Sequence, residues 1–221
     1  MPAKNRDLHG NAPDNSDIAF ILIDVINDLA FDDGKKLLKH AVPMAKRIAT
    51  LKARAKQAGI PSIYVNDNFG RWQSDFQKLI EHCLMDDVCG KPLATILKPE
   101  EDDYFVLKPK HSGFYSTTLN LLLSYLGVKT VILTGIAGNI CVLFTANDAY
   151  MRDYQLIIPA DCVASNTVKE NTSALELMKK VLKADIRAST ELDFHKLLLS
   201  NRDAATQSGG KKSPRTTGSG R

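Results

Sequence analysis

The sequence predicts an α/β protein with a doubly wound, mainly parallel six-stranded sheet and helices on both faces. Two observations favour this class. Short apolar runs alternate along the chain with amphipathic stretches of helical length. The chain of 221 residues is also long enough to bury one sizeable core. Strands that are joined through helices form parallel βαβ units with right-handed crossovers.

The expected strands are the apolar runs. They cover residues 18–24, 61–67, 103–108, 130–134, 155–159 and 185–188. The first run ends in an acid, Asp24, and the fourth leads into a turn that contains glycine. Runs of this length that lack regular polar alternation are typical of strands buried on both faces of a parallel sheet.

The expected helices follow the strands. They cover residues 35–58, 74–83, 117–126, 140–153 and 169–183, and residues 84–101 are expected to be mostly a connection. Gly59 and Gly127 end two of them. Pro43 is a candidate break in the first helix, because proline in a helix interior removes one backbone hydrogen bond.

Composition divides the chain into three parts. Residues 1–16 are polar and are expected to be flexible, residues 17–200 form one domain, and residues 201–221 are expected to be a disordered basic tail rich in Gly, Ser and Thr. The tail has a net charge of +4, equal to that of the whole chain, so the domain is close to neutral. We therefore expect no nucleic-acid partner for the domain.

The setting predicted for the chain is the cytoplasm. No apolar run reaches the length of a membrane-spanning helix, and the N-terminus lacks the apolar core of a secretory signal. The four cysteines form no CxxC pair, and a chain of this size needs no disulfides. A reducing compartment without membrane attachment fits both observations.

Three residues are expected to meet at one edge of the sheet. Asp24 ends the first strand, Lys108 ends the third, and Cys141 follows the fourth at the start of a helix. In doubly wound sheets, active sites lie at the carboxyl ends of the strands. A thiol at a helix start beside a lysine is a candidate nucleophile, and both features are expected to favour the thiolate.

Three motifs resemble the isochorismatase-like cysteine hydrolases, the family of nicotinamidases and N-carbamoylsarcosine amidases. They are LIDVINDL at 22–29, LKPKHSGFYSTTL at 107–119 and TGIAGNICVLFTANDAY at 134–150. The resemblance implies a three-layer fold, a homodimer or homotetramer, and a catalytic triad of Asp24, Lys108 and Cys141. It also implies a cis peptide between Ile136 and Ala137 and an oxyanion hole made by the N–H groups of Ala137 and Cys141.

The chain departs from the family pattern at two places. Ile26 and Leu29 replace the glutamine and the aromatic residue that usually follow the aspartate. The segment YVNDNFGRW at 64–72 lacks the histidines of the nicotinamidase metal site. We therefore expect no metal and no cofactor, and nicotinamide is disfavoured as a substrate.

The function implied is hydrolysis of a C–N bond in a small carboxamide or ureide. Cys141 would attack the carbonyl and form a thioester, and Asp24 would accept the thiol proton and pass it to the leaving nitrogen. Other functions stay open at this point: a vinyl-ether hydrolase of the isochorismate type, a non-catalytic binding or scaffold subunit, and a redox sensor that uses Cys141 and Cys162.

Each site residue also has a structural interpretation. Asp24 could cap a turn, Cys141 could be a small core residue, and Lys110 is an alternative to Lys108. His111 could contact the substrate or lie on the surface. The side chains expected to line the substrate pocket are Phe69, Trp72, Phe114 and Tyr115.

Overall fold

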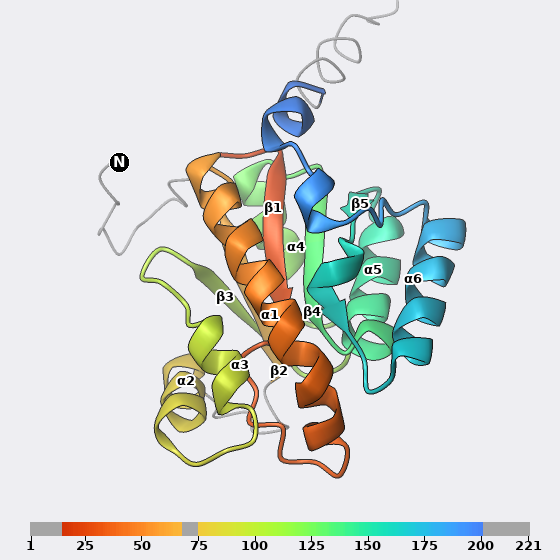
Figure 1. Cartoon of the computed structure of the whole chain (residues 1–221). Coiled ribbons are helices and arrows are strands. Elements are labelled where there is room, and N and C mark those ends of the chain that lie inside the picture. The colour runs from red at the N-terminus through yellow and green to blue at the C-terminus, as the bar shows by residue number, and fades with distance from the viewer. Residues whose placement is uncertain (1–14, 68–74, 201–221) are drawn as a thin grey trace, which may run out of the picture.

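The computed structural model describes residues 15–67 and 75–200 and contains the expected parallel sheet (Figure 1). The strands are β1 (Ile18–Ile23), β2 (Ser62–Asp67), β3 (Tyr104–Lys108), β4 (Thr130–Ile136), β5 (Gln155–Ile157) and β6 (Val163–Ala164). The order is β3-β2-β1-β4-β5, with β6 beside the carboxyl end of β4. All of these pairs are parallel, so the strand order reverses between β1 and β4, as in a doubly wound sheet.

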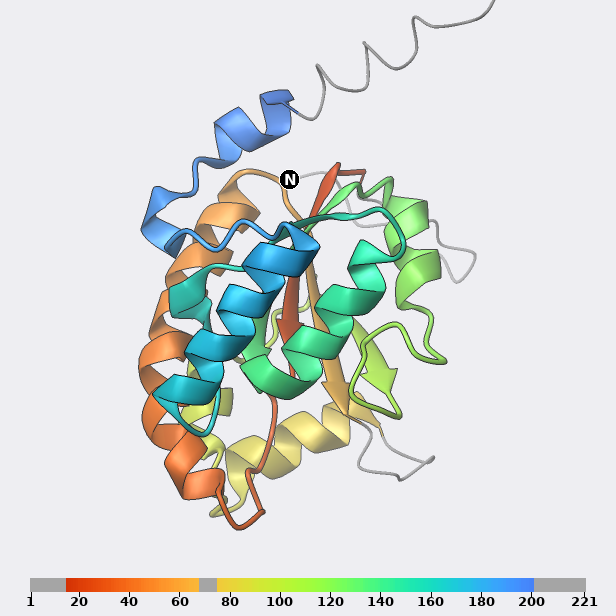
Figure 2. The same ribbon diagram turned by 90° about the vertical axis from the view of Figure 1, so that its right-hand side faces the viewer.

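Helices cover both faces of the sheet, as predicted. The first face carries α1 (Gly34–Gln57), α2 (Phe76–Met85) and α3 (Lys91–Ile96), and the second carries α4 (Leu119–Leu126), α5 (Leu143–Tyr150) and α6 (Val168–Leu182). Figure 2 shows α5 and α6 side by side in front of the sheet. Alternate residues of β1 enter the two cores: Phe20 and Leu22 pack with α1, whereas Ile21 and Ile23 pack on the opposite face.

Two helical predictions need correction. Pro43 lies inside α1, which continues from Gly34 to Gln57. The side chain of Pro43 is exposed, so water can bond the carbonyl group that the proline leaves without a donor. The segment 84–101, expected to be a connection, contains α3, a six-residue helix with proline in its first turn. Only two of its residues are buried, which is too few to show as periodicity.

The sixth strand is not where the sequence predicted it. Residues 185–188 form no strand, and Asp185 makes one isolated parallel bridge to Ile157. The sixth strand is the two-residue β6, which is too short to produce an apolar run. Beyond it, a helix begins at residue 194, where the guanidinium of Arg54 in α1 lies 5.4 Å from the ring centre of Phe194.

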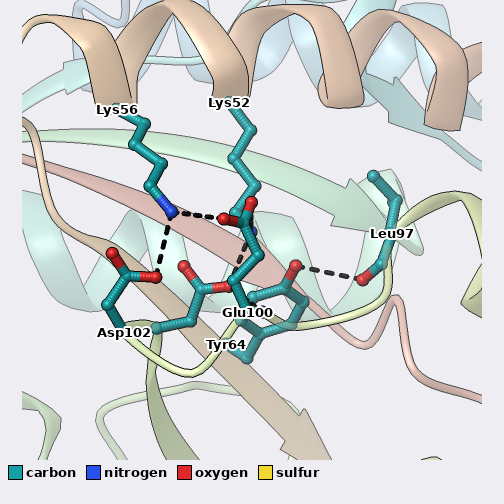
Figure 3. A network of polar contacts seen from close by, with 7 residues as sticks. Lys52, Lys56, Tyr64, Leu97, Glu100 and Asp102 are labelled. Carbon is teal, nitrogen blue, oxygen red and sulfur yellow. Dashed lines mark hydrogen bonds and ion pairs between the residues drawn. The ribbon is translucent and has the colours of Figure 1, made fainter.

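A polar network joins α1 to the segment that precedes β3 (Figure 3). Lys52 is buried and pairs with Asp103 at 2.5 Å and with Glu100 at 3.3 Å. Lys56, closer to solvent, pairs with Glu100 and with Asp102. The network therefore attaches α1 to the start of the edge strand whose last residue is Lys108.

Candidate active site

Asp24, Lys108 and Cys141 lie together at the carboxyl edge of the sheet, toward which the strand arrows point in Figure 2. Lys108 Nζ lies 2.9 Å from Asp24 Oδ2 and 3.5 Å from Cys141 Sγ. Asp24 and Lys108 are buried, whereas Cys141 is half-buried. A base, a cation and a thiol from three separate parts of the chain are thus within contact distance.

Asp24 follows β1 directly and is held in place from two directions. Its backbone is in the left-handed region, with φ of 51°, which turns the chain away from the strand. Its Oδ1 accepts a hydrogen bond of 2.7 Å from the backbone N–H of Asp67. Its Oδ2 pairs with Lys108, so both carboxylate oxygens have partners.

Cys141 is carried by a tight connection between β4 and α5. At Gly135, with φ of 112°, a Cβ atom would lie 2.1 Å from the carbonyl oxygen of Ile23, so only glycine lets β4 pass β1 this closely. The peptide between Ile136 and Ala137 is cis. The carbonyl of Ala137 then accepts hydrogen bonds from the N–H groups of Ile140 and Val142, at 3.0 and 3.2 Å.

The first turn after β4 is π-helical, not the start of the α-helix expected from residue 140. It is η1 (Gly138–Val142), and α5 begins after it. A serine beyond β6, Ser165, accepts a hydrogen bond of 3.2 Å from the N–H of Asn139 in this turn. Single π-helical turns are frequent at functional sites, and here the turn carries the thiol.

The loop after β3 is attached to the helix that follows Cys141. Ser112 donates a hydrogen bond to the carboxylate of Asp148. The hydroxyl of Thr145 accepts the N–H of Gly113 at 2.9 Å and donates to the carbonyl of Cys141 at 2.7 Å. The lysine loop and the cysteine turn are therefore held together by hydrogen bonds through α5.

The electrostatics of the thiol differ from the prediction. Burial and the carboxylate of Asp24 raise the pKa of Cys141 to about 12, although the cation of Lys108 opposes them. Lys108 thus lowers the pKa of the thiol, as expected, but the prediction that the resting site favours a thiolate does not hold. Desolvation of the sulfur anion and the nearby carboxylate of Asp24 together outweigh the cation.

The two partners of the thiol have coupled charges. Burial raises the pKa of Asp24, while the charge of Lys108 and a hydrogen bond with Cys141 lower it in part. Burial lowers the pKa of Lys108, but Asp24 and Cys141 raise it more, so its pKa lies above the usual lysine value. Lys108 is thus a permanent cation beside a carboxylate that can exchange a proton.

Two residues that the sequence did not assign to the site lie in it or next to it. Asp67, the last residue of β2, places Oδ2 3.5 Å from Lys108 Nζ. His111, which was left open, is exposed and places Nδ1 4.0 Å from Cys141 Sγ. The sequence could have indicated Asp67 as well, because it is an acid at the carboxyl end of a strand, where active sites of doubly wound sheets lie.

The expected pocket residues have different positions. Phe114 is buried in the second core, with its ring centre 6.0 Å from that of Tyr154, so it does not line an open pocket. Tyr115 is exposed. Phe69 and Trp72 lie outside the described residues, as do residues 1–14 and the proposed tail 201–221.

The remaining candidate groups are also placed. Lys110 is exposed, and it is Lys108 that contacts Asp24 and Cys141. All four cysteines are free, and Cys162 is buried. Within residues 15–67 and 75–200, no group of three or more His, Cys, Asp or Glu side chains could hold a metal ion. No helix in these ranges is long and apolar enough to cross a membrane.

Curated proteins are similar to this chain in sequence. An uncharacterized isochorismatase family protein, YaaI, from Bacillus subtilis (strain 168) is 45% identical over 177 residues, which cover 80% of this chain and 97% of that protein. The ureidoacrylate amidohydrolase RutB of Methylorubrum extorquens is 30% identical over 142 residues, which cover 54% of this chain and 56% of that protein. This chain therefore spans little more than half the length of RutB.

A solved structure and a family model agree with these relatives. The N-carbamoylsarcosine amidase of Thermoplasma acidophilum aligns with a TM-score of 0.62 at 26% identity, over 80% of this chain and 98% of that one. The isochorismatase domain model matches residues 18–189, nearly all of the described region. The chain belongs to the isochorismatase family of hydrolases.

Proposed function

We propose that this protein is a cysteine-dependent hydrolase that cleaves a C–N bond of a small carboxamide or ureide through a thioester. The observation that carries the proposal is the contact of Lys108 with both Asp24 and Cys141 at the carboxyl edge of the sheet. A base, an orienting cation and a nucleophile in mutual reach are the components of nucleophilic acyl transfer.

Asp24 is the group that activates the thiol. Because Cys141 is protonated at rest, attack on the substrate carbonyl requires transfer of its proton to Asp24. Sulfur then bonds to the carbonyl carbon, the C–N bond breaks, and the proton passes from Asp24 to the leaving nitrogen. The products of this step are an acyl thioester and an amine or ammonia, and water later releases the acyl group.

Backbone N–H groups and Lys108 stabilise the negative charge that develops. The N–H groups of Ala137 and Cys141 are proposed to form the oxyanion hole. Ala137 lies between β4 and η1, and Cys141 lies within η1. Loss of one such donor typically lowers kcat by about 10²–10³. Lys108 keeps Asp24 in place and stays charged through the cycle.

The relatives favour a carbamoyl group in the substrate. Ureidoacrylate and N-carbamoylsarcosine, which the names of two relatives contain, both carry a carbamoyl group on nitrogen. We therefore place small ureides ahead of simple carboxamides as substrates. The enzyme is proposed to need no cofactor, because the acid, base and nucleophile of the reaction are all side chains of the chain.

The proposed setting is a homodimer or homotetramer in the cytoplasm, built from one domain at residues 17–200. Four free cysteines are compatible with a reducing compartment. Exposed apolar side chains on α5 and α6, among them Phe144, Leu177 and Val181, offer surface for contact between copies.

The test is a screen of small ureides and carboxamides for release of ammonia or amine. Wild type is compared with Cys141→Ala and with Cys162→Ala, a matched control that removes a buried thiol elsewhere. We expect turnover by wild type and Cys162→Ala and none by Cys141→Ala. Full activity of Cys141→Ala, or no turnover of any ureide or amide by wild type, would contradict the proposal.

A further inference from the structure

The exposed side of the thiol has a polar neighbour that the acylation step does not use. His111 lies 4.0 Å from Cys141 through Nδ1, whereas Asp24 and Lys108 contact the same sulfur from the buried side. The imidazole is exposed, and its ring centre lies 5.5 Å from that of Phe144 on α5. The sulfur thus has buried partners on one side and a histidine on the side open to water.

The position of His111 relative to the sulfur is fixed by its neighbours in sequence. Ser112 donates to Asp148, and the N–H of Gly113 bonds to Thr145, which itself bonds to the carbonyl of Cys141. Ser112, Gly113 and Thr145 are all buried. His111 is therefore the last residue before a segment that is attached to α5, the helix that follows Cys141.

The second half of the reaction needs a base near the thioester, and a group on the exposed side of the sulfur is suited to that role. After the amine leaves, a water molecule must reach the thioester from solvent. Asp24 is only 4% exposed, and its oxygens are bonded to Asp67 and Lys108. A ring nitrogen on the exposed side can accept a proton from water that arrives there.

We propose that His111 is the catalytic base for release of the acyl group, an inference that rests on the proposed function. Water oxygen bonds to the thioester carbon while His111 accepts one of its protons. The tetrahedral intermediate collapses, the C–S bond breaks, and the proton passes from His111 to the sulfur. One thioester and one water thus give a carboxylic or carbamic acid and the free thiol of Cys141.

The test separates formation of the thioester from its hydrolysis. p-Nitrophenyl acetate is the probe, because it can acetylate an activated thiol whether or not the natural amide is known. The burst of p-nitrophenolate reports acylation, the steady rate reports release, and peptide mapping locates the acetyl group. The variants are His111→Gln and His111→Ala, with His195→Gln as the matched control. His195 is also exposed and lines a groove with Arg54 and Gln57 at the far end of α1.

We expect the burst of His111→Gln to match that of wild type and its steady rate to fall by about 10²-fold or more. The acetyl group should accumulate on Cys141, and imidazole in solution should restore release in His111→Ala. A structural role for His111 would slow the burst as well. His195→Gln should behave like wild type in both phases.

Two kinds of result would overturn the inference. If His111→Gln releases acetate as fast as wild type after the same burst, or loses burst and steady rate together, His111 is not the base and the proposed function is unaffected. If wild type shows no acetylation of Cys141, the proposed function fails, and the role of His111 fails with it.

Discussion

The proton on Cys141 decides how this site is activated. Its pKa is raised by burial and by the charge of Asp24. The carboxylate that helps to keep the thiol neutral at rest is therefore also the group that we propose as the acceptor of its proton. The pKa of the proposed nucleophile therefore cannot be changed through Asp24 without also changing the proposed base. A change that makes the thiol more acidic by removing Asp24 also removes the acceptor.

The variant Asp24→Asn is expected to separate reactivity from catalysis. Without the carboxylate charge, the pKa of Cys141 should fall, and alkylation by iodoacetamide at neutral pH should become faster than in wild type. Hydrolysis should fall by about 10²–10⁴, because the amide cannot accept the proton. Mass spectrometry would follow alkylation, with the half-buried Cys89 as reference. Slower alkylation of Cys141 in the variant would contradict this account.

The pH dependence follows from the same residue. In the proposed mechanism Asp24 acts as its carboxylate, and burial raises its pKa above the usual value of about 3.9. Activity is therefore present above that raised pKa and is lost as the pH falls through it. We expect the acid limb of kcat/KM to lie at a higher pH than an exposed aspartate would give. An acid limb at the ordinary aspartate value would show that another group controls the reaction.

At the residue scale, the sequence predicted that Asp24, Lys108 and Cys141 lie together, but it did not predict their neighbours. Their common location could be predicted because the carboxyl ends of parallel strands lie at one edge of the sheet, and Asp24, Lys108 and Cys141 all lie at or after such ends. Phe114 was misplaced because an aromatic residue beside a motif can face the core or the pocket. The proton on Cys141 could not be predicted, since it depends on burial that no local pattern encodes.

The network between α1 and the start of β3 contains a buried and an exposed lysine one turn apart. The side chain of Lys52 is 7% exposed and that of Asp103 is 6% exposed, whereas the side chain of Lys56 is 39% exposed. Removing one partner of a buried pair leaves a charge without compensation, but an exposed pair contributes little. Comparing substitutions of the two lysines therefore tests how burial changes the contribution of an ion pair to stability.

Lys52→Met is expected to lower the free energy of unfolding by about 3 kcal/mol. Lys56→Met should lower it by less than about 1 kcal/mol, because water solvates the carboxylates that it leaves. Urea unfolding of both variants measures the difference. Burial already raises the pKa of Asp103, so the loss in Lys52→Met should shrink as the pH falls and Asp103 becomes neutral. An equal loss in the free energy of unfolding for Lys52→Met and Lys56→Met would show that burial makes no difference to these ion pairs.

At the element scale, the long elements were predictable and the short ones were not. The 24 residues of α1 show clear periodicity, and Gly127 ends α4 in the left-handed conformation, as its sequence indicates. The two residues of β6 and the π-helical turn at Gly138–Val142 leave no periodic signal. Their conformations depend on packing against β4 and α6, which is a tertiary effect.

At the scale of the whole molecule, the described residues form two hydrophobic cores that share one sheet. β1 and β4 contribute alternate side chains to both cores, so the central strands are covered by helices on each face. The helix that begins at residue 194 adds Leu197 and Leu198 to the first core. Residues described by the structure therefore pack on both faces of the sheet.

Deleting residues 204–221 is expected to leave kcat/KM and the melting temperature nearly unchanged. The deleted segment is rich in Gly, Ser, Thr and basic residues and has no large apolar side chain with which to join either core. Thermal unfolding and a turnover assay of the truncated chain provide the measurement. A clear drop in either quantity would show that the tail packs against the domain.

The strand order places the three residues of the candidate site at or after the ends of strands that differ in how many neighbouring strands they pair with. Asp24 and Cys141 follow the central strands β1 and β4, but Lys108 ends β3, the strand at the edge. Amide hydrogens of β3 should therefore exchange with deuterated water sooner than those of β1 and β4. Opening of that edge alone would withdraw the cation while the rest of the sheet stays closed. In rising urea, the enzyme should consequently lose activity before its circular dichroism signal falls.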